Sequence, residues 1–120
     1  MQNIAGTYEL IKYGYDYKNN QTFKPISEFY SGMIHYSETG FMSVTLRFAE
    51  KPEALDEIVG YCGNYKIEQN KIIHTVLSSV RPEYENQVLV REFKIVDNHL
   101  ELEFENTADF RKFAIWKKIN

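Results

Sequence analysis

The sequence predicts an all-β protein: a closed up-and-down antiparallel β-barrel of about eight strands, with one short helix capping a mouth. Apolar and polar residues alternate through most of the chain, which is the period of a half-buried strand. Short clusters of turn-forming residues separate these runs. Aromatic residues make up 15% of the chain, and aromatic side chains favour strands. Consecutive hairpins of this kind favour a barrel, because closure removes exposed strand edges.

Length and composition limit the domain count and the partners. The 120 residues, of which 43% are hydrophobic, predict a single domain over residues 1–120 that needs no disulfide or metal. The lone Cys62 is predicted to be an inert core residue. The net charge of -3 argues against nucleic-acid binding through phosphate contacts. No signal peptide or long apolar run is evident, so we expect a cytoplasmic protein that does not insert into a membrane.

The first half of the chain is predicted to form four strands, over residues 4–17, 22–24, 29–36 and 41–48. In the first strand both faces carry bulky residues, which is typical of a long curved strand, and Gly14 allows a bend. Residues 37–40 form the turn of the clearest hairpin. The strand after that turn has an inward face of alternating apolar residues, Met42, Val44, Leu46 and Phe48.

The segment from residue 49 to 61 breaks the alternation. Pro52 suits a helix start, and the acidic residues after it favour the positive N-terminal end of a helix. Leu55, Ile58 and Val59 recur at the spacing i, i+3 and i+4. We therefore predict about two turns of amphipathic helix, ended by Gly60, that form a plug or lid over one mouth of the barrel.

The second half is predicted to form strands over residues 61–68, 71–80, 87–96, 99–105 and 110–118. The connection RPEYEN in the central hairpin is too long for a tight turn. Inward faces are predicted for two sets of residues: Ile72, His74 and Val76, and then Leu89, Arg91, Phe93 and Ile95. Glu101, Glu103 and Glu105 alternate with apolar residues and are predicted to form a solvent-facing stripe.

The inward-facing histidine and arginine are the candidate site residues. His74 titrates near physiological pH and suits a proton shuttle or a ligand-orienting donor, or else it is satisfied by a neighbouring carbonyl or tyrosine. Arg91 cannot lose its proton, so its burial requires compensation. An anionic ligand, an ion pair with Glu9 or another acid, and an outward-facing register all remain open for Arg91.

The lining of such a barrel is predicted from residues that combine apolar surface with a polar or adaptable tip. Tyr36, Tyr61, Tyr65 and Tyr84 each offer a ring and a hydroxyl, and Met42 suits an adaptable wall, although ordinary core packing explains these residues as well. The three histidines show no metal-ligand spacing, and neither a phosphate loop nor a nucleophile elbow is present. We therefore predict no metal and no cofactor.

Several motifs, taken together and in order, resemble the bacterial and fungal lipocalin-like domain family of calycin-type barrels. They are Gly6-Thr7-Tyr8, GMIHYSETGFMSVTL, YCGNYKI, IIHTVLSSVRPEYEN, VREFKI and IWKK, and they extend from about Ile4 to Lys117. The resemblance implies an eight-stranded barrel with a central cavity. In lipocalins a tryptophan on the first strand closes the barrel floor beneath a basic side chain from the last strand. Tyr8 stands in that place here, with Lys117 or Arg111 as its basic partner.

The resemblance and the residues together predict a binding protein. Its ligand is a small, mainly apolar molecule that can carry an anionic group, anchored by Arg91 and His74 and surrounded by Tyr61, Tyr65, Met42 and Tyr36. One alternative is a cyclase or isomerase of a biosynthetic pathway, in which His74 or a tyrosine supplies acid/base help. A second alternative is a structural module, filled by its own side chains, that acts through its surface or as a homodimer.

Overall fold

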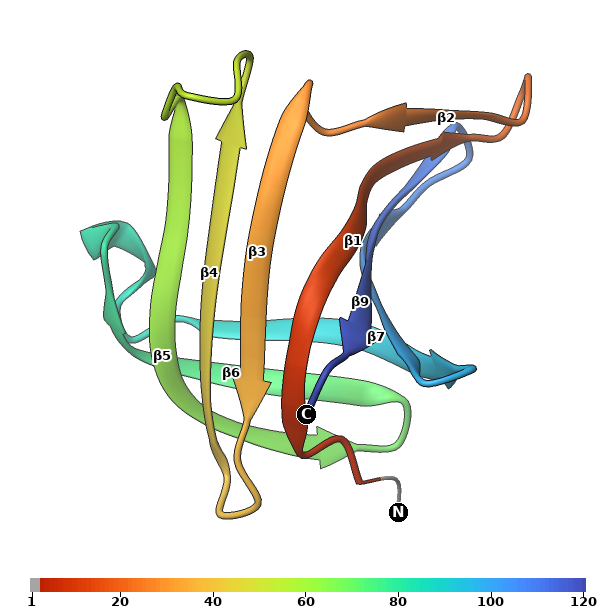
Figure 1. Cartoon of the computed structure of the whole chain (residues 1–120). Helices are drawn as coiled ribbons and strands as arrows, with labels where there is room; N and C mark the ends of the chain where they lie inside the picture. Colours follow the sequence, from red (N-terminus) through yellow and green to blue (C-terminus); the bar gives the residue numbers. More distant parts are fainter. Residues whose placement is uncertain (1–2) are drawn as a thin grey trace.

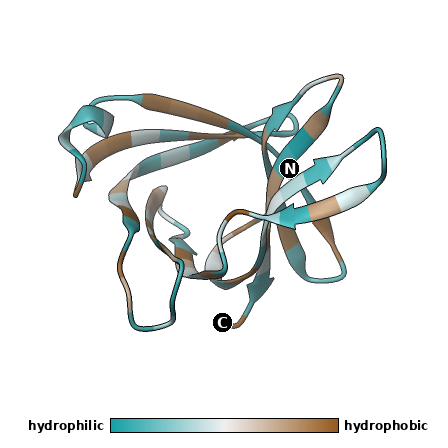
Figure 2. Ribbon diagram, turned by 90° about the horizontal axis from the view of Figure 1, so that it is seen from above, coloured by the Kyte–Doolittle hydropathy of each residue, from teal (hydrophilic) through white to brown (hydrophobic). Residues whose placement is uncertain are grey.

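The chain folds into a closed antiparallel barrel. The computed structural model describes residues 3–120 and contains nine strands in one sheet (Figure 1). The strands are β1 (Gly6–Tyr17), β2 (Thr22–Pro25), β3 (Phe29–Tyr36), β4 (Phe41–Ala49), β5 (Glu57–Glu68), β6 (Lys71–Ser79), β7 (Val88–Val96), β8 (His99–Asn106) and β9 (Phe110–Lys118). The last strand, β9, returns to pair with β1 and closes the wall. Viewed from above, the strands form a ring (Figure 2). The predicted fold class is confirmed.

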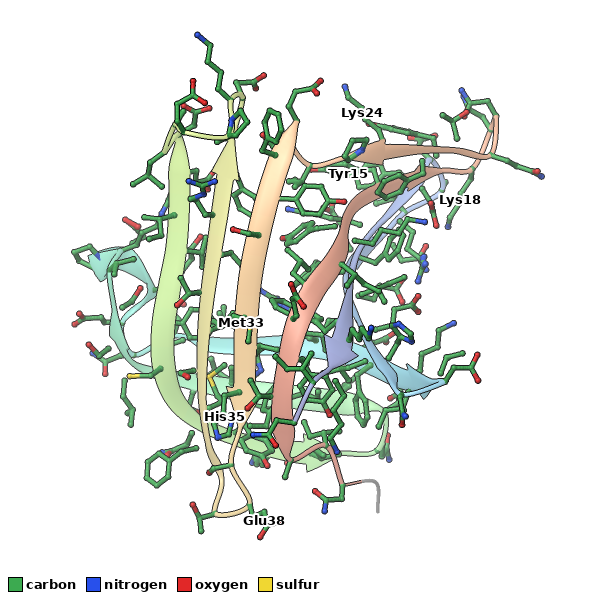
Figure 3. The ribbon with its side chains drawn as sticks, in the orientation of Figure 1. Tyr15, Lys18, Lys24, Met33, His35 and Glu38 are labelled. Atoms are coloured by element: carbon green, nitrogen blue, oxygen red, sulfur yellow. The ribbon has the colours of Figure 1, made fainter. Side chains whose placement is uncertain are left out.

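Eight of the nine strands make the barrel wall, and β2 lies outside it. Residues Gly6–Glu9 of β1 pair with β3, whereas the later residues Gly14–Tyr17 pair with β2. The β1–β2 hairpin therefore extends beyond one end of the barrel, where Figure 3 labels Tyr15, Lys18 and Lys24. Figure 3 places Glu38, in the turn between β3 and β4, at the opposite end of the molecule.

A β-bulge at Ile11 explains why both faces of the first strand carry bulky residues. The pairing of β1 with β9 shifts register between Leu10 and Lys12. An extra residue in one strand reverses the alternation from that point on. Tyr8 and Leu10 before the bulge and Tyr13 after it are therefore all buried, while Ile11 is exposed.

The predicted helix is wrong: residues 51–56 form a turn, and Glu57 already begins β5. The turn is held by Asp56, whose carboxylate accepts a hydrogen bond from the Glu50 amide at 2.7 Å. Ile58 and Val59 pair with β4 instead of forming one helix face. A helix of two turns is marginal on its own, so the strand pairing with β4 replaces it. Leu55 is exposed, and no α-helix caps the mouth among residues 3–120.

The central hairpin forms as predicted, with a short 3₁₀ turn, η1 (Pro82–Tyr84), between β6 and β7. Ile72, His74 and Val76 are all buried, which confirms the inward face of β6. On β7 the prediction holds for Phe93, which is buried, but Ile95 is exposed near the end of the strand.

Two expectations about individual side chains are wrong. Cys62 is exposed and does not lie in the core, because β5 alternates and its neighbour Tyr61 faces inward. Glu101 does not belong to a free solvent stripe, because its side chain is only 15% exposed and pairs with Arg111 and Lys94 at 3.2 Å each. The outer face of β8 therefore carries an ion-pair network.

Side chains fill one end of the barrel. Tyr8, Tyr36, Met42, Ile72 and Leu100 are buried there as part of the hydrophobic core cluster. The Tyr8 hydroxyl donates a hydrogen bond to the Ile4 carbonyl at 2.8 Å. The predicted partnership of Tyr8 with Arg111 does not occur, because Arg111 lies opposite Asp16 at the other end of β9. The predicted alternative, Lys117, is opposite Glu9.

Candidate functional site

A cavity of about 250 Å³ occupies the other half of the barrel. Most of its wall is apolar or aromatic, formed by Tyr13, Ile26, Ile34, Val44, Leu46, Phe48, Val59, Leu89, Leu102, Phe104 and Trp116. The polar lining consists of Glu57, Tyr61, His74, Tyr84, Arg91 and Lys112. A cavity of this volume accommodates several waters or one small molecule. Apolar walls with a few polar groups are typical of ligand pockets.

Arg91 brings a permanent positive charge into this lining. It lies on β7 opposite Ile72 of β6, in the inward register that the sequence predicts. Among residues 3–120 the guanidinium forms no ion pair, so the alternative of a pairing with Glu9 does not occur. Its hydrogen bond within the described chain joins Nη1 to the adjacent Val90 carbonyl at 3.3 Å.

Two stacked aromatic rings, and not an acidic side chain, position the guanidinium of Arg91. The guanidinium carbon lies 4.9 Å from the centre of the Phe104 ring. Phe104 stacks in turn on Tyr13, with ring centres 5.2 Å apart and planes 9° apart. Such a cation–π contact stabilises by roughly 0.5–1 kcal/mol at partly exposed sites. The guanidinium is thus positioned by aromatic rings, and its charge is left for another group to balance.

His74 forms the centre of a buried hydrogen-bond chain. Its Nε2 lies 2.7 Å from the Tyr36 hydroxyl, and its Nδ1 lies 2.8 Å from the Tyr61 hydroxyl. The three side chains come from β6, β3 and β5. Both ring nitrogens therefore have a tyrosine partner, as one of the two sequence-based interpretations of His74 predicts. His74 and Tyr61 also line the cavity, so the chain runs from the filled core to the cavity wall.

Burial sets the charge state of this chain. Desolvation, with a smaller contribution from the positive charge of Arg91, lowers the pKa of His74 to about 3. The imidazole is therefore neutral at pH 7. Burial raises the pKa of Tyr61 to about 12, against the lowering effect of Arg91. The pKa of Tyr36 is raised for the same main reason, so both phenols keep their protons.

The predicted site residues divide into two groups. Arg91, His74 and Tyr61 line the cavity, as does Tyr84. Tyr36, Tyr65 and Met42 lie in the packed half instead and are not part of the cavity wall. The Tyr65 ring packs edge-on against Tyr36, and its hydroxyl donates to the Ser37 carbonyl at 2.5 Å.

Several lining residues were not predicted from the sequence. Tyr13 and Phe104 support Arg91, and Lys112 and Glu57 add charges to the wall. Glu57 is paired with Arg81 at 3.1 Å. Trp116 lines the cavity with a buried Nε1 that has no acceptor among residues 3–120. The alternation along β8 is the signal that could have identified Phe104 as inward-facing, whereas Tyr13 reaches the cavity only because of the bulge.

A family model described as a lipocalin-like domain matches residues 5–119, which is nearly the whole chain. The chain belongs to the lipocalin-like domain family. No curated protein matches this lipocalin-like domain. Its described residues contain no cluster of histidine, cysteine and acidic side chains that could hold a metal ion. None of the helices in the described part of the domain is long and apolar enough to cross a membrane.

Proposed function

We propose that this lipocalin-like domain binds a small, mainly apolar molecule in the cavity. The observation that carries the proposal is a mainly apolar cavity whose lining includes Arg91, a cation that has no ion-pair partner among residues 3–120. A barrel that served only as a structural module would be expected to fill both halves, as buried side chains fill one half here.

Membership of the family supports the barrel, and the lining supports the ligand class. Aromatic and aliphatic side chains form most of the wall, so transfer of an apolar molecule from water into the cavity is favourable. The neutral state of His74 at pH 7 makes it a weak base. This counts against the form of the cyclase or isomerase alternative in which His74, and not a tyrosine, accepts a proton.

A thermal-shift titration with propylbenzene tests the proposal. A ligand that binds only the folded state raises its stability, by about 2.7 kcal/mol at a hundredfold excess over Kd. We expect a concentration-dependent rise in the Tm of the wild type. No rise with propylbenzene or with shorter alkylbenzenes would contradict binding in the cavity.

A pair of neighbouring substitutions on β4 localises the binding. Val44 lines the cavity, whereas the next residue, Thr45, is exposed on the outer face. Val44→Phe places a larger side chain in the cavity, so we expect it to lose the propylbenzene shift. Thr45→Phe adds a similar ring outside and should keep the shift. Equal shifts in both variants would place the binding elsewhere.

A further inference from the structure

The direction of the hydrogen-bond chain is set at its buried end, by Tyr36. Among residues 3–120, the Tyr36 hydroxyl has a single hydrogen-bond partner, the Nε2 atom of His74 at 2.7 Å. The side chain is 0% exposed, so water does not reach it. A buried hydroxyl proton without an acceptor is costly in free energy. Tyr36 therefore donates its proton to His74 Nε2.

This direction fixes the tautomer of His74 and the role of Tyr61. A neutral imidazole has one N–H group and one acceptor nitrogen. Because Nε2 accepts, the proton is on Nδ1, which lies 2.8 Å from the Tyr61 oxygen and donates to it. The proton of Tyr61 itself then has no acceptor among residues 3–120, and Tyr61 lines the cavity. The chain thus presents a hydrogen-bond donor to the cavity.

The neighbouring groups have the same polarity. Arg91 carries only donors and a fixed positive charge. Lys112 adds a second cation to the lining. Glu57 is the carboxylate in the described lining, and Arg81 already holds it at 3.1 Å. The polar part of the wall therefore offers donors and positive charge and lacks a free acceptor of matching strength.

We propose that the cavity selects a small apolar molecule that ends in a carboxylate. One carboxylate oxygen accepts a hydrogen bond from the Tyr61 hydroxyl. Tyr36, acting through His74, orients that hydroxyl as a donor, and the positive charge of Arg91 balances the negative charge of the carboxylate. This inference rests on the proposed function and narrows its ligand class. Tyr36 is a positioning residue in this arrangement, because it acts through His74 and does not line the cavity.

A matched ligand series tests the class. Hydrocinnamic acid, the corresponding alcohol, the corresponding amine and propylbenzene share one skeleton and differ at one end. Isothermal titration at neutral pH should show the acid binding at least tenfold more tightly than the alcohol, as expected for hydrogen bonds to a charged group. The amine should bind most weakly of the polar members, because its charge repels Arg91.

The series separates this inference from the proposed function. Equal affinities for acid and alcohol, with propylbenzene still bound, would overturn the carboxylate preference and leave apolar binding intact. Failure of all four compounds to bind would overturn both proposals.

Substitution of Tyr36 tests the positioning role. In Tyr36→Phe, Nε2 loses its donor, so the imidazole can carry its proton there and accept from Tyr61 through Nδ1. We expect affinity for the acid to fall about threefold or more, while affinity for propylbenzene stays within twofold. The control is Tyr65→Phe, which removes a hydroxyl bonded to the Ser37 carbonyl from the same region, and should change neither affinity. An unchanged acid affinity in Tyr36→Phe would contradict the positioning role.

The tautomer is directly measurable in the unaltered protein, which keeps the inference testable if Tyr36→Phe does not fold. Long-range proton–nitrogen NMR spectra distinguish a protonated imidazole nitrogen from an unprotonated one. Variants of His35 and His99 assign the His74 signals. A proton on Nδ1 is the expected result, and a proton on Nε2 would overturn the inference.

Discussion

Two arginines lie on opposite sides of the barrel wall and differ in how their charges are balanced. Arg111 on the outer face lies over Phe113 at 4.1 Å, and Arg91 in the cavity lies over Phe104 at 4.9 Å. Arg111 pairs with Glu101 at 3.2 Å and with Asp16 at 3.5 Å. Arg91 has no ion pair among residues 3–120.

The difference distinguishes Arg111, whose charge is used in ion pairs within the chain, from Arg91, whose charge is free to interact with a ligand. A buried or half-buried charge is costly in free energy unless another charge or hydrogen bonds compensate it. The outer network provides this compensation within the chain, at the pairing of β8 with β9. Arg91 forms no ion pair in the described chain, so its positive charge is available to attract an anionic group of a molecule in the cavity.

The largest expected effect is on the pH dependence of stability, and it comes from His74, which lines the cavity together with Arg91. The pKa of His74 is about 3 when folded and near 6.5 when unfolded, so between these values the unfolded chain binds a proton that the folded protein does not. Wild-type stability therefore falls as the pH drops below 6.5. The variant His74→Gln lacks this titration. The difference in free energy of unfolding between the wild type and this variant should therefore decrease by roughly 2 kcal/mol as the pH is lowered from about 6.5 to 5.

Urea denaturation of both proteins at a series of pH values measures this decrease. The difference between the two proteins cancels the titration of carboxylates that they share. A difference that stays constant across this pH range would show that His74 is not held neutral by burial.

The second effect is on ligand affinity. Arg91→Leu removes this interior charge and should weaken binding of hydrocinnamate about 10- to 30-fold, as expected for lost interactions with a charged group. Arg111→Leu changes the outer network and should leave this affinity within twofold. Isothermal titration measures both. Equal losses in the two variants would remove the functional distinction between the two arginines.

The third effect is on stability, for which we expect substitution of Arg111 to matter more than substitution of Arg91. Arg111→Leu leaves Glu101, which is only 15% exposed, with Lys94 as its remaining charged partner. We expect a loss of about 1–2 kcal/mol in the free energy of unfolding, measured with urea. Lys66→Leu breaks an exposed pair with Glu68 and serves as the control, with a change below about 0.5 kcal/mol. Similar losses in both variants would contradict a structural role for the outer network.

The smallest effect is the stability of Arg91→Leu. The substitution removes a cation with no ion pair and also its contact with Phe104, two changes of opposite sign. The free energy of unfolding should therefore stay within about 1 kcal/mol of the wild type in the same urea experiments. A loss larger than that of Arg111→Leu would mean that Arg91 serves the fold.

The sequence predicted those features that depend on local alternation. The inward positions of His74 and Arg91 follow from the period of their strands, and the hairpin connections follow from turn residues. The helix prediction failed because pairing of Ile58 and Val59 with β4 is a tertiary interaction that a local pattern does not contain. The inward turn of Tyr13 depends on a bulge that only the pairing with β9 reveals.

The candidate site was predicted by residue type and not by geometry. The sequence identified His74 and a set of tyrosines, but the two that contact it are 38 and 13 residues away along the chain. Which tyrosines reach the imidazole depends on strand register and barrel curvature. The missing acidic partner of Arg91 is likewise a property of the folded barrel, since the sequence supplies many carboxylates.

The pairing of β1 with β9 has a consequence for folding kinetics. It joins segments that are distant in the sequence; Asp16 and Arg111, for example, are 95 residues apart. Closing so long a loop has a larger entropic cost than forming any hairpin, so we expect this pairing to form last and to open first. The cavity takes Tyr13 from β1 and Trp116 from β9, so it is complete only after that step. A bound molecule should therefore slow unfolding while leaving the folding rate nearly unchanged.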